Sequence, residues 1–289
     1  MTTNKSLETK IVQTSAGEVE YIDQGKGKPI LFVHGSPGGC DQSILMSNFL
    51  IKKGFRIIAP SRSGYLNTRI SDSNKTPKQQ ADLHIALMDQ LKIDTFSAMC
   101  WSGGGPSTYL LAAKYPKRVK NIVACAAVSK AYKFKGGVEN SLMYGNIGKW
   151  LLAEMAKHSP KSLIKSTLAE EGDLSKLQVK DLTRQIWQDP IKRDFVVNLS
   201  ATLAGRKAGL NNDHKQFPQI TDLELSKIAC PVLLVHGTVD SDVPLDNSDF
   251  AHKKIANSEF VKIIDGTHLA VWTDPSSDNV QKQIIEFIA

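Results

Sequence analysis

About a third of the way along the chain, the sequence reads Thr95-Phe96-Ser97-Ala98-Met99-Cys100-Trp101-Ser102-Gly103-Gly104-Gly105-Pro106. An apolar run ends, one serine follows, and a glycine-rich helix start comes next. This order predicts a sharp strand-to-helix turn with Ser102 at its apex, where the hydroxyl is exposed above the edge of a sheet. The strained backbone of such a turn needs small residues two positions to either side, here Cys100 and Gly104. We therefore predict Ser102 as a nucleophile.

A serine hydroxyl needs a base to remove its proton and an acid to orient that base. Two later apolar runs lead into such residues. Residues 232–237 lead into Asp240, and residues 260–264 lead into His268. The order Ser, Asp, His is the one expected when the nucleophile sits on a strand–turn–helix elbow. We predict His268 as the base and Asp240 as the acid.

Other residues compete for these roles. Asp242 lies two positions beyond Asp240, where its side chain would be aimed differently. Of the six other histidines, His34 and His236 belong to His-Gly turns and are interpreted as structural. Cys100 is disfavoured as the nucleophile because it lies on the expected strand rather than at the apex of the turn.

A glycine-rich loop upstream supplies the fourth part of the predicted site, after the nucleophile, the base and the acid. An apolar run over residues 29–33 ends in His34-Gly35-Ser36-Pro37-Gly38-Gly39. Such a loop at the end of a buried strand can turn its amides inward. We predict that the amides of Ser36 and Gly103 form an oxyanion hole, in which each donor is worth about 3–4 kcal/mol of transition-state stabilisation.

Four segments together resemble the α/β-hydrolase superfamily, and the resemblance covers nearly the whole chain. Cys100 stands where the family usually has glycine. The serine at position 102 disfavours dehalogenase and epoxide hydrolase chemistry, which uses aspartate there. The loop over residues 61–65 and the elbow itself resemble those of lid-bearing bacterial serine hydrolases. The matching segments are the oxyanion loop His34–Pro37, the elbow Cys100–Gly104, the acid stretch His236–Pro244 and the base stretch Gly266–His268.

The remaining pattern predicts an α/β fold with a mostly parallel sheet and helices on both faces. We expect a hairpin over 8–23, strands over 30–33, 55–59, 95–99 and 119–128, and helices over 42–52 and 76–91. Strand signals then give way to helical ones over 142–155, 162–171, 176–187 and 194–203. We predict a helical lid over 129–227, inserted between core segments 1–128 and 228–289.

The apolar residues of this expected lid either bind substrate or pack the lid against the core, and packing is the preferred interpretation for each one. They include Met143, Trp150, Leu151, Trp187 and Phe195. Arg62 either meets a substrate carboxylate or forms a salt bridge within its loop, and we prefer the salt bridge. The segment Asn211-Asn212-Asp213, near the end of the lid, receives no role.

Composition narrows the class of protein further. The chain has 289 residues and a net charge of +7, but its lysines are scattered, which favours solvated surface charge over nucleic-acid binding. The beginning of the sequence is polar, and no stretch reaches the roughly 18–20 apolar residues of a membrane span. Four cysteines without metal-ligand spacing indicate reduced thiols in a cytoplasmic protein. No metal or cofactor motif is present.

These features predict a cytoplasmic serine hydrolase that cleaves a small-molecule ester, with no cofactor. Homo-oligomer formation stays open. The same triad also cleaves N-terminal prolyl amides and activated C–C bonds, so both remain alternatives. A ligand receptor built on the same scaffold is a further alternative, because fold and triad do not set the turnover rate.

Overall fold

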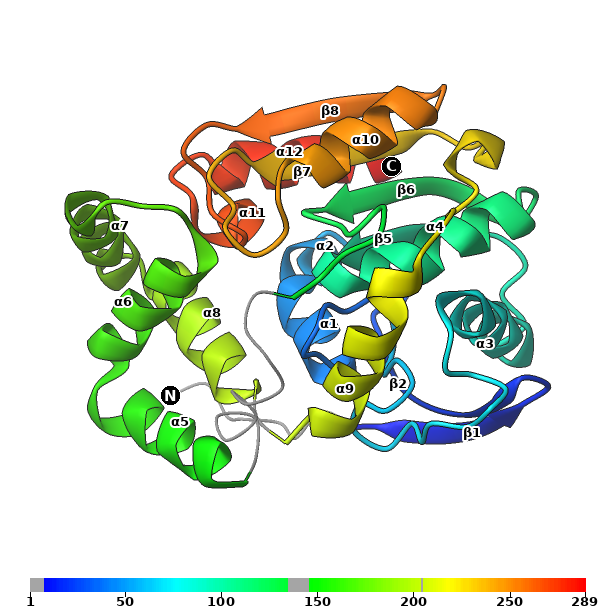
Figure 1. The fold of residues 1–289 in the computed structure, drawn as a ribbon, viewed down its shortest axis with the longest axis horizontal. Helices are drawn as coiled ribbons and strands as arrows, with labels where there is room; N and C mark the ends of the chain where they lie inside the picture. Colours follow the sequence, from blue (N-terminus) through cyan, green and yellow to red (C-terminus); the bar gives the residue numbers. More distant parts are fainter. Residues whose placement is uncertain (1–7, 135–145, 204) are drawn as a thin grey trace.

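The computed structural model describes residues 8–134, 146–203 and 205–289. Its strands are β1 (Lys10–Thr14), β2 (Gly17–Gln24), β3 (Pro29–Val33), β4 (Arg56–Pro60), β5 (Phe96–Trp101), β6 (Val119–Cys125), β7 (Val232–Gly237) and β8 (Ser258–Ile263). Within the described residues they form one eight-stranded sheet in the order β1-β2-β4-β3-β5-β6-β7-β8 (Figure 1). The first two pairs are antiparallel and the others parallel, which confirms the predicted fold class.

The parallel strands are continuously apolar because helices cover both faces of the sheet. On β3, Ile30 and Phe32 belong to one core, and Leu31 and Val33 to the other. The first core is completed by α1 (Cys40–Met46), α2 (Asn48–Lys52), α11 (Ala270–Thr273) and α12 (Ser277–Ile288), and the second by α3 (Pro77–Gln90), α4 (Gly105–Lys114) and α10 (Asp246–Lys254).

Two expected elements differ from the prediction, one by a break and the other by an early end. The helix expected over 42–52 is broken at Ser47, since the carbonyl of Met46 accepts a hydrogen bond from the indole N–H of Trp272 at 2.8 Å. The strand expected to reach residue 128 ends at Cys125, because Ala126 takes a φ of 45° that a strand cannot continue. The helix expected over 76–91 forms as α3, and Thr76 caps it through a capping box with Gln79.

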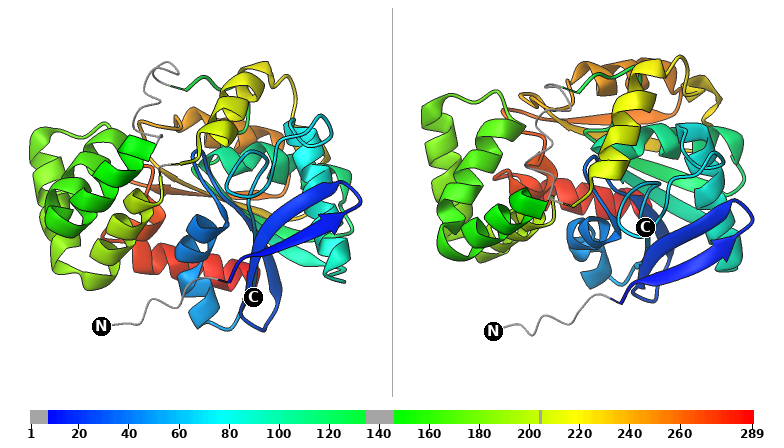
Figure 2. Two further views of the ribbon diagram at one scale, coloured as in Figure 1. Left: turned by 90° about the horizontal axis from the view of Figure 1, so that it is seen from below. Right: turned by 60° about the horizontal axis from the view of Figure 1, so that its bottom comes forward.

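The described part of the segment between β6 and β7 is mostly helical. The helices α5 (Asn146–His158), α6 (Pro160–Glu171), α7 (Lys176–Gln188) and α8 (Pro190–Ala201) pack together beside the sheet, as Figures 1 and 2 show. We call these four helices the helical insertion. A further helix that the sequence pattern did not predict, α9 (Lys207–Gln216), follows them. Met143 and the expected helix start at 142 lie outside the described residues.

Among the apolar residues named for this segment, Phe195 is buried and stacks on Trp272, with ring centroids 5.8 Å apart. It therefore packs the insertion to the body, as the preferred interpretation has it. Trp150 and Leu151 are exposed, at 65% and 40%. They take no part in that contact.

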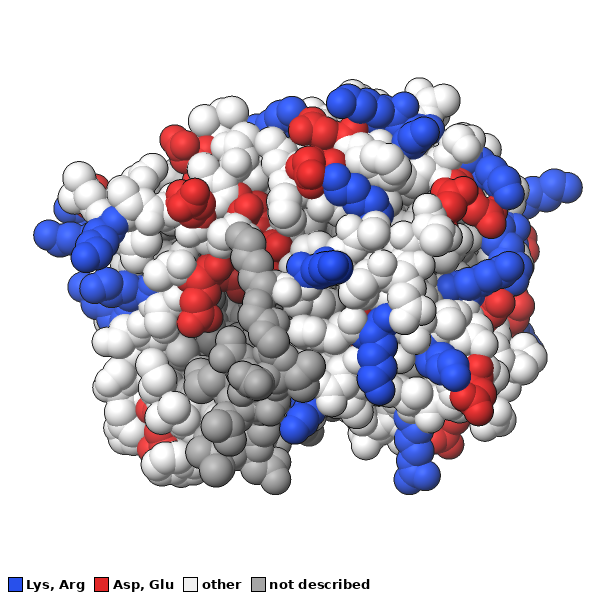
Figure 3. Space-filling view, viewed as in Figure 1, with Lys and Arg blue, Asp and Glu red and all other residues white. Residues whose placement is uncertain are grey.

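The distribution of charged side chains on the surface agrees with the scattered lysines of the sequence. Figure 3 shows Lys and Arg distributed among Asp and Glu over the face that it displays. Among the helices of the described residues, none is long and apolar enough to cross a bilayer.

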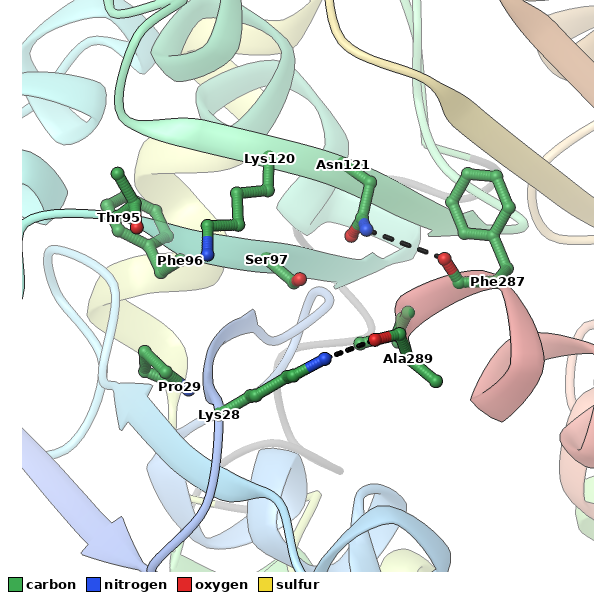
Figure 4. Close-up of a pocket in the computed structure, with 10 residues that line it drawn as sticks. Lys28, Pro29, Thr95, Phe96, Ser97, Lys120, Asn121, Phe287 and Ala289 are labelled. Carbon is green, nitrogen blue, oxygen red and sulfur yellow. Dashed lines mark hydrogen bonds between the residues drawn. The ribbon is translucent and has the colours of Figure 1, made fainter.

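A pocket lies at the amino ends of the parallel strands. Its lining includes Pro29 at the start of β3 and Phe96 at the start of β5, and it is closed by the last residues of α12 (Figure 4). Asn121 donates a hydrogen bond to the carbonyl of Phe287 across it. Active sites of open α/β sheets lie at the opposite, carboxyl ends of the strands. The candidate site is therefore elsewhere.

One buried histidine in this body predicts a loss of stability in acid. Burial, with a smaller effect of Arg62, lowers the pKa of His84 from 6.5 to about 3. The unfolded chain binds a proton at His84 more readily than the folded chain does. The contribution of the neutral His84 to stability is therefore fully present above about pH 6.5 and is lost progressively as the pH falls toward 3. This histidine alone contributes a loss of about 2 kcal/mol at pH 5. Urea unfolding of His84→Gln should show a drop between pH 7 and pH 5 that is smaller by this amount.

The matched control is His252→Gln, since His252 is exposed on α10. Its stability should follow the wild type across the same pH range. Equal acid sensitivity in the His84 variant and in the wild type would contradict the prediction.

Candidate active site

Ser102 lies at the turn between β5 and α4, where it begins the 3-10 turn η1 (Ser102–Gly104). Its φ of 51° falls in the left-handed region that residues other than glycine rarely adopt. Close packing maintains the turn, because a Cβ on Gly104 would lie 2.3 Å from the carbonyl oxygen of Val33. The turn therefore has the strained geometry that the sequence predicted around Ser102.

Cys100 fits two positions before the serine as the penultimate residue of β5. It is fully buried, and burial raises the pKa of its thiol to about 12. A thiol is nucleophilic only as the thiolate. The protonated, buried Cys100 is thus a poor candidate nucleophile beside Ser102.

Asp240 follows β7, and its buried carboxylate is fully hydrogen-bonded. Oδ1 accepts from the amides of Asp242 and Val243, both at 2.9 Å. Oδ2 lies 2.7 Å from Nδ1 of His268 and 3.0 Å from Nε2 of His236. Burial raises the pKa of Asp240, but the charge of His268 and hydrogen bonds from both imidazoles bring it down to about 2. Asp240 is therefore an anion that fixes Nδ1 of His268 as the donor and directs Nε2 away from itself.

The structure does not join Ser102 to His268 by a hydrogen bond. Among the described residues, Nε2 of His268 has no hydrogen-bond partner, although it lies 3.4 Å from Oδ2 of Asp242. The imidazole stays beside the serine turn through Trp101, whose ring centroid is 5.0 Å away and whose indole N–H donates to the carbonyl of His268 at 3.3 Å. Catalytic hydrogen bonds often tighten only when substrate binds.

Three carboxylates surround His268. Asp240 and Asp242 come from the loop after β7, and Glu171 is the last residue of α6. Burial lowers the pKa of His268, whereas Asp240, then Asp242 and Glu171, raise it to about 10. Burial also raises the pKa of Glu171 to about 8. This part of the site therefore favours positive charge on or beside the imidazole.

Strand register brings Ser36 next to Gly103. β3 and β5 pair in parallel with Val33 opposite Cys100, so the positions three residues further on leave the sheet side by side. A Cβ on Gly103 would lie only 2.1 Å from the Ser36 hydroxyl oxygen. The two amides predicted to bind an oxyanion thus belong to adjoining backbone segments. Their role in catalysis stays a prediction.

A buried ion pair holds the Ser36 loop in place. The two guanidinium NH groups of Arg62 donate to the carboxylate of Asp213 at 2.7 and 3.0 Å, and both side chains are almost completely buried. Arg62 also donates to the carbonyl of Gly35 at 2.9 Å and to the Ser36 hydroxyl at 2.7 Å. Asp213 accepts from the Ser36 and Tyr65 hydroxyls at 2.5 and 2.6 Å. The Ser36 hydroxyl is therefore engaged, so its amide is the group left to bind a substrate oxygen.

Sequence reasoning missed Asp213 and Glu171. Arg62 in a loop of small residues signals that a partner exists, and the salt-bridge interpretation of Arg62 agrees with the structure. That partner, however, is 151 positions further along the chain on α9, where no pattern marks it. Glu171 ends a helix of the insertion, and nothing in the sequence relates it to His268.

The end of α6 is attached directly to the loops that carry Asp240 and His268. The carbonyl of Glu171 accepts a hydrogen bond from the amide of His268 at 2.9 Å, and Gly172 pairs with Asp240 in an isolated antiparallel bridge. A Cβ on Gly172 would lie 2.6 Å from the side chain of Thr267, so glycine permits this approach. The helical insertion thus contributes to the geometry around the candidate acid and base.

The fold and this arrangement define a class of protein. Residues 28–275 match the profile of the α/β hydrolase fold, and the chain belongs to that family. It is a hydrolase of this family, and its sheet and elbow agree with that membership.

Similar proteins support this assignment over nearly the full length. An α/β hydrolase fold protein from Nakamurella multipartita superposes with a TM-score of 0.93 at 44% identity, covering 97% of this chain and 99% of that one. The uncharacterised hydrolase YcgS of Bacillus subtilis is 25% identical over 94% of this chain and 95% of its own length. The human serine hydrolase BPHL is 26% identical over 91% of this chain and 81% of its own length.

The ion pair of Arg62 and Asp213 gives the second prediction. Asp213→Asn keeps the shape of the side chain but removes the charge that holds Arg62, so the Ser36 loop should shift. A displacement of about 1 Å in such a loop costs on the order of 100-fold in rate. We expect kcat to fall by about 10- to 100-fold with a smaller change in KM, measured by steady-state hydrolysis of a p-nitrophenyl ester.

Asp23→Asn is the matched control, because Asp23 forms a similar bidentate pair with Arg56 on strands β2 and β4. It should lower the melting temperature with little effect on kcat. An Asp213 variant that loses stability yet keeps the wild-type kcat would show that the ion pair supports the fold alone.

Proposed function

We propose that the protein is a serine hydrolase that cleaves small carboxylic esters through a Ser102–His268–Asp240 triad. The observation that carries the proposal is the strained Ser102 at the carboxyl end of β5, on the same sheet edge as the Asp240–His268 pair with its 2.7 Å contact. The likeness to a relative named a serine hydrolase supports the reaction class. The preference for esters rests on how common that chemistry is among such triads.

The geometry suggests how each group acts. The Ser102 oxygen attacks the ester carbonyl while its proton passes to Nε2 of His268. The resulting oxyanion accepts hydrogen bonds from the amides of Ser36 and Gly103. The intermediate then collapses, and the departing alkoxide oxygen takes the proton from His268 and leaves as the alcohol. Water, activated by the same imidazole, cleaves the acyl-enzyme and releases the carboxylic acid.

Asp240 has a separate part in this proposed sequence. Although its carboxylate is buried, the four hydrogen bonds that it accepts keep it ionised, and it holds His268 in one orientation. It also stabilises the imidazolium that forms when Ser102 is deprotonated. The helical insertion would act as a lid that excludes water from the acyl-enzyme and limits the size of the substrate.

The third prediction tests the nucleophile. Purified wild type and Ser102→Ala are compared in steady-state hydrolysis of p-nitrophenyl esters from acetate to decanoate. We expect the variant to lose kcat on the order of 10⁶-fold, as other triads do when the nucleophile is removed. The chain length that the wild type hydrolyses best then measures the space beneath the insertion.

Cys100→Ala is the matched control, since it removes the neighbouring thiol and leaves the serine in place. It should keep turnover within a few-fold of the wild type. Loss of activity in this variant, together with its retention in Ser102→Ala, would make Cys100 the nucleophile. A folded wild type that turns over none of the esters would overturn the ester assignment and direct the search to prolyl amides and C–C substrates.

A further inference from the structure

Three potential metal ligands converge beside the candidate base. A ring nitrogen of His268, a carboxylate oxygen of Asp242 and one of Glu171 all lie within 4.8 Å of one another. Figure 3 shows several acidic side chains on this face of the molecule, around the junction between the insertion and the loops after the last strands. The three ligands come from different elements, namely the end of α6, the loop after β7 and the loop after β8.

Two of these atoms are already at the separation that a tetrahedral site requires. Nε2 of His268 and Oδ2 of Asp242 are 3.4 Å apart. Zinc binds imidazole nitrogen and carboxylate oxygen at about 2.0–2.1 Å, which places neighbouring tetrahedral ligands about 3.3–3.4 Å from each other. An ion could therefore bridge His268 and Asp242 with little movement, and Glu171 offers a third ligand atom within 4.8 Å of both.

The surrounding hydrogen bonds prepare His268 for metal binding. Asp240 accepts a hydrogen bond from Nδ1–H at 2.7 Å, so Nε2 is the nitrogen that would bind an ion once the ion displaces its proton. A carboxylate that holds the far nitrogen of a metal-bound histidine fixes the ring and raises its basicity as a ligand. The Tyr132 hydroxyl contacts the other oxygen of Asp242 at 3.3 Å and orients that carboxylate.

Two of the ligand groups also present buried polar atoms that no hydrogen bond satisfies. Among the described residues, neither Nε2 of His268 nor Oε2 of Glu171 has a hydrogen-bond partner, and the His268 side chain is only 1% exposed. Leaving such buried atoms unsatisfied is unfavourable, and a bound ion would satisfy both of them. Asp242 is 39% exposed and provides the path from solvent.

We propose that His268, Asp242 and Glu171 form a binding site for a divalent transition-metal ion, with Zn²⁺ the best match. One nitrogen and two oxygens with a fourth position left for water is a ligand set that zinc accepts. Ca²⁺ and Mg²⁺ prefer six or more oxygen ligands, so a site built on imidazole selects against them.

Occupancy would block catalysis rather than assist it, a consequence that rests on the proposed function. The metal takes the lone pair of Nε2 that would receive the proton of Ser102. Zinc should therefore inhibit ester hydrolysis reversibly, and removal of zinc by EDTA should restore it.

Isothermal titration of metal-free protein with ZnCl₂ tests the site without any need for turnover. We expect one Zn²⁺ per chain, no heat with MgCl₂ or CaCl₂, and an affinity lowered at least about 10-fold in both Glu171→Gln and Asp242→Asn. Both replacements keep the side-chain shape, and thermal melting verifies that each variant is folded. Unchanged zinc affinity in the two folded variants would overturn the proposal.

His158→Gln is the matched control, because His158 and Glu154 form an exposed histidine–carboxylate pair 3.3 Å apart on α5. This variant should keep the wild-type zinc affinity, and loss of binding there would move the site to the surface of the insertion. A parallel hydrolysis assay separates the two proposals. Zinc binding without esterase activity would remove the proposed function alone, whereas zinc binding that leaves an active esterase uninhibited would exclude His268 as a ligand.

Discussion

The parallel pairing of β3 with β5 is the interaction on which the candidate site depends. At this pair the strand order reverses direction, since β4 flanks β3 on one side and β5 flanks it on the other. The connections after the two strands therefore diverge and open a crevice at their carboxyl ends. The register of Val33 opposite Cys100 then places Ser36 against Gly103, which belongs to the turn that carries Ser102.

The loops of this crevice are held in place by buried charge rather than by apolar packing alone. Arg62 and Asp213 are each satisfied by several hydrogen bonds, as a buried ion pair must be if its desolvation is to be offset. Asp240 is satisfied in the same way by two amides and two imidazoles. His268 and Glu171 differ, because each keeps an unsatisfied atom. Side chains whose hydrogen bonds are complete thus surround one place, at His268 and Glu171, where hydrogen bonding is incomplete. Such places are where catalysis or ligand binding is expected.

How much the sequence could predict depended on whether the signal was local. Ser102, Asp240 and His268 each follow an apolar strand in the expected order, so pattern and spacing were enough to name them as candidates, and the sheet itself was predicted almost strand by strand. Asp213 and Glu171 lie on helices and meet their partners only through the tertiary fold. The break at Ser47 has the same origin, since it depends on Trp272 from the far end of the chain.

The attachment of the insertion limits how this enzyme can diversify. Gly172 joins the insertion to the Asp240 loop at one point, and Asp213, beyond its last helix, supports the Ser36 loop at another. Exchanging the whole segment for that of another family member would remove both supports together, so the segment is not a modular part. New substrate ranges are more accessible through replacement of side chains within α5 to α8, which leaves both attachments intact. Substrate specificity can then change gradually during evolution while the arrangement of Ser102, Asp240 and His268 stays the same.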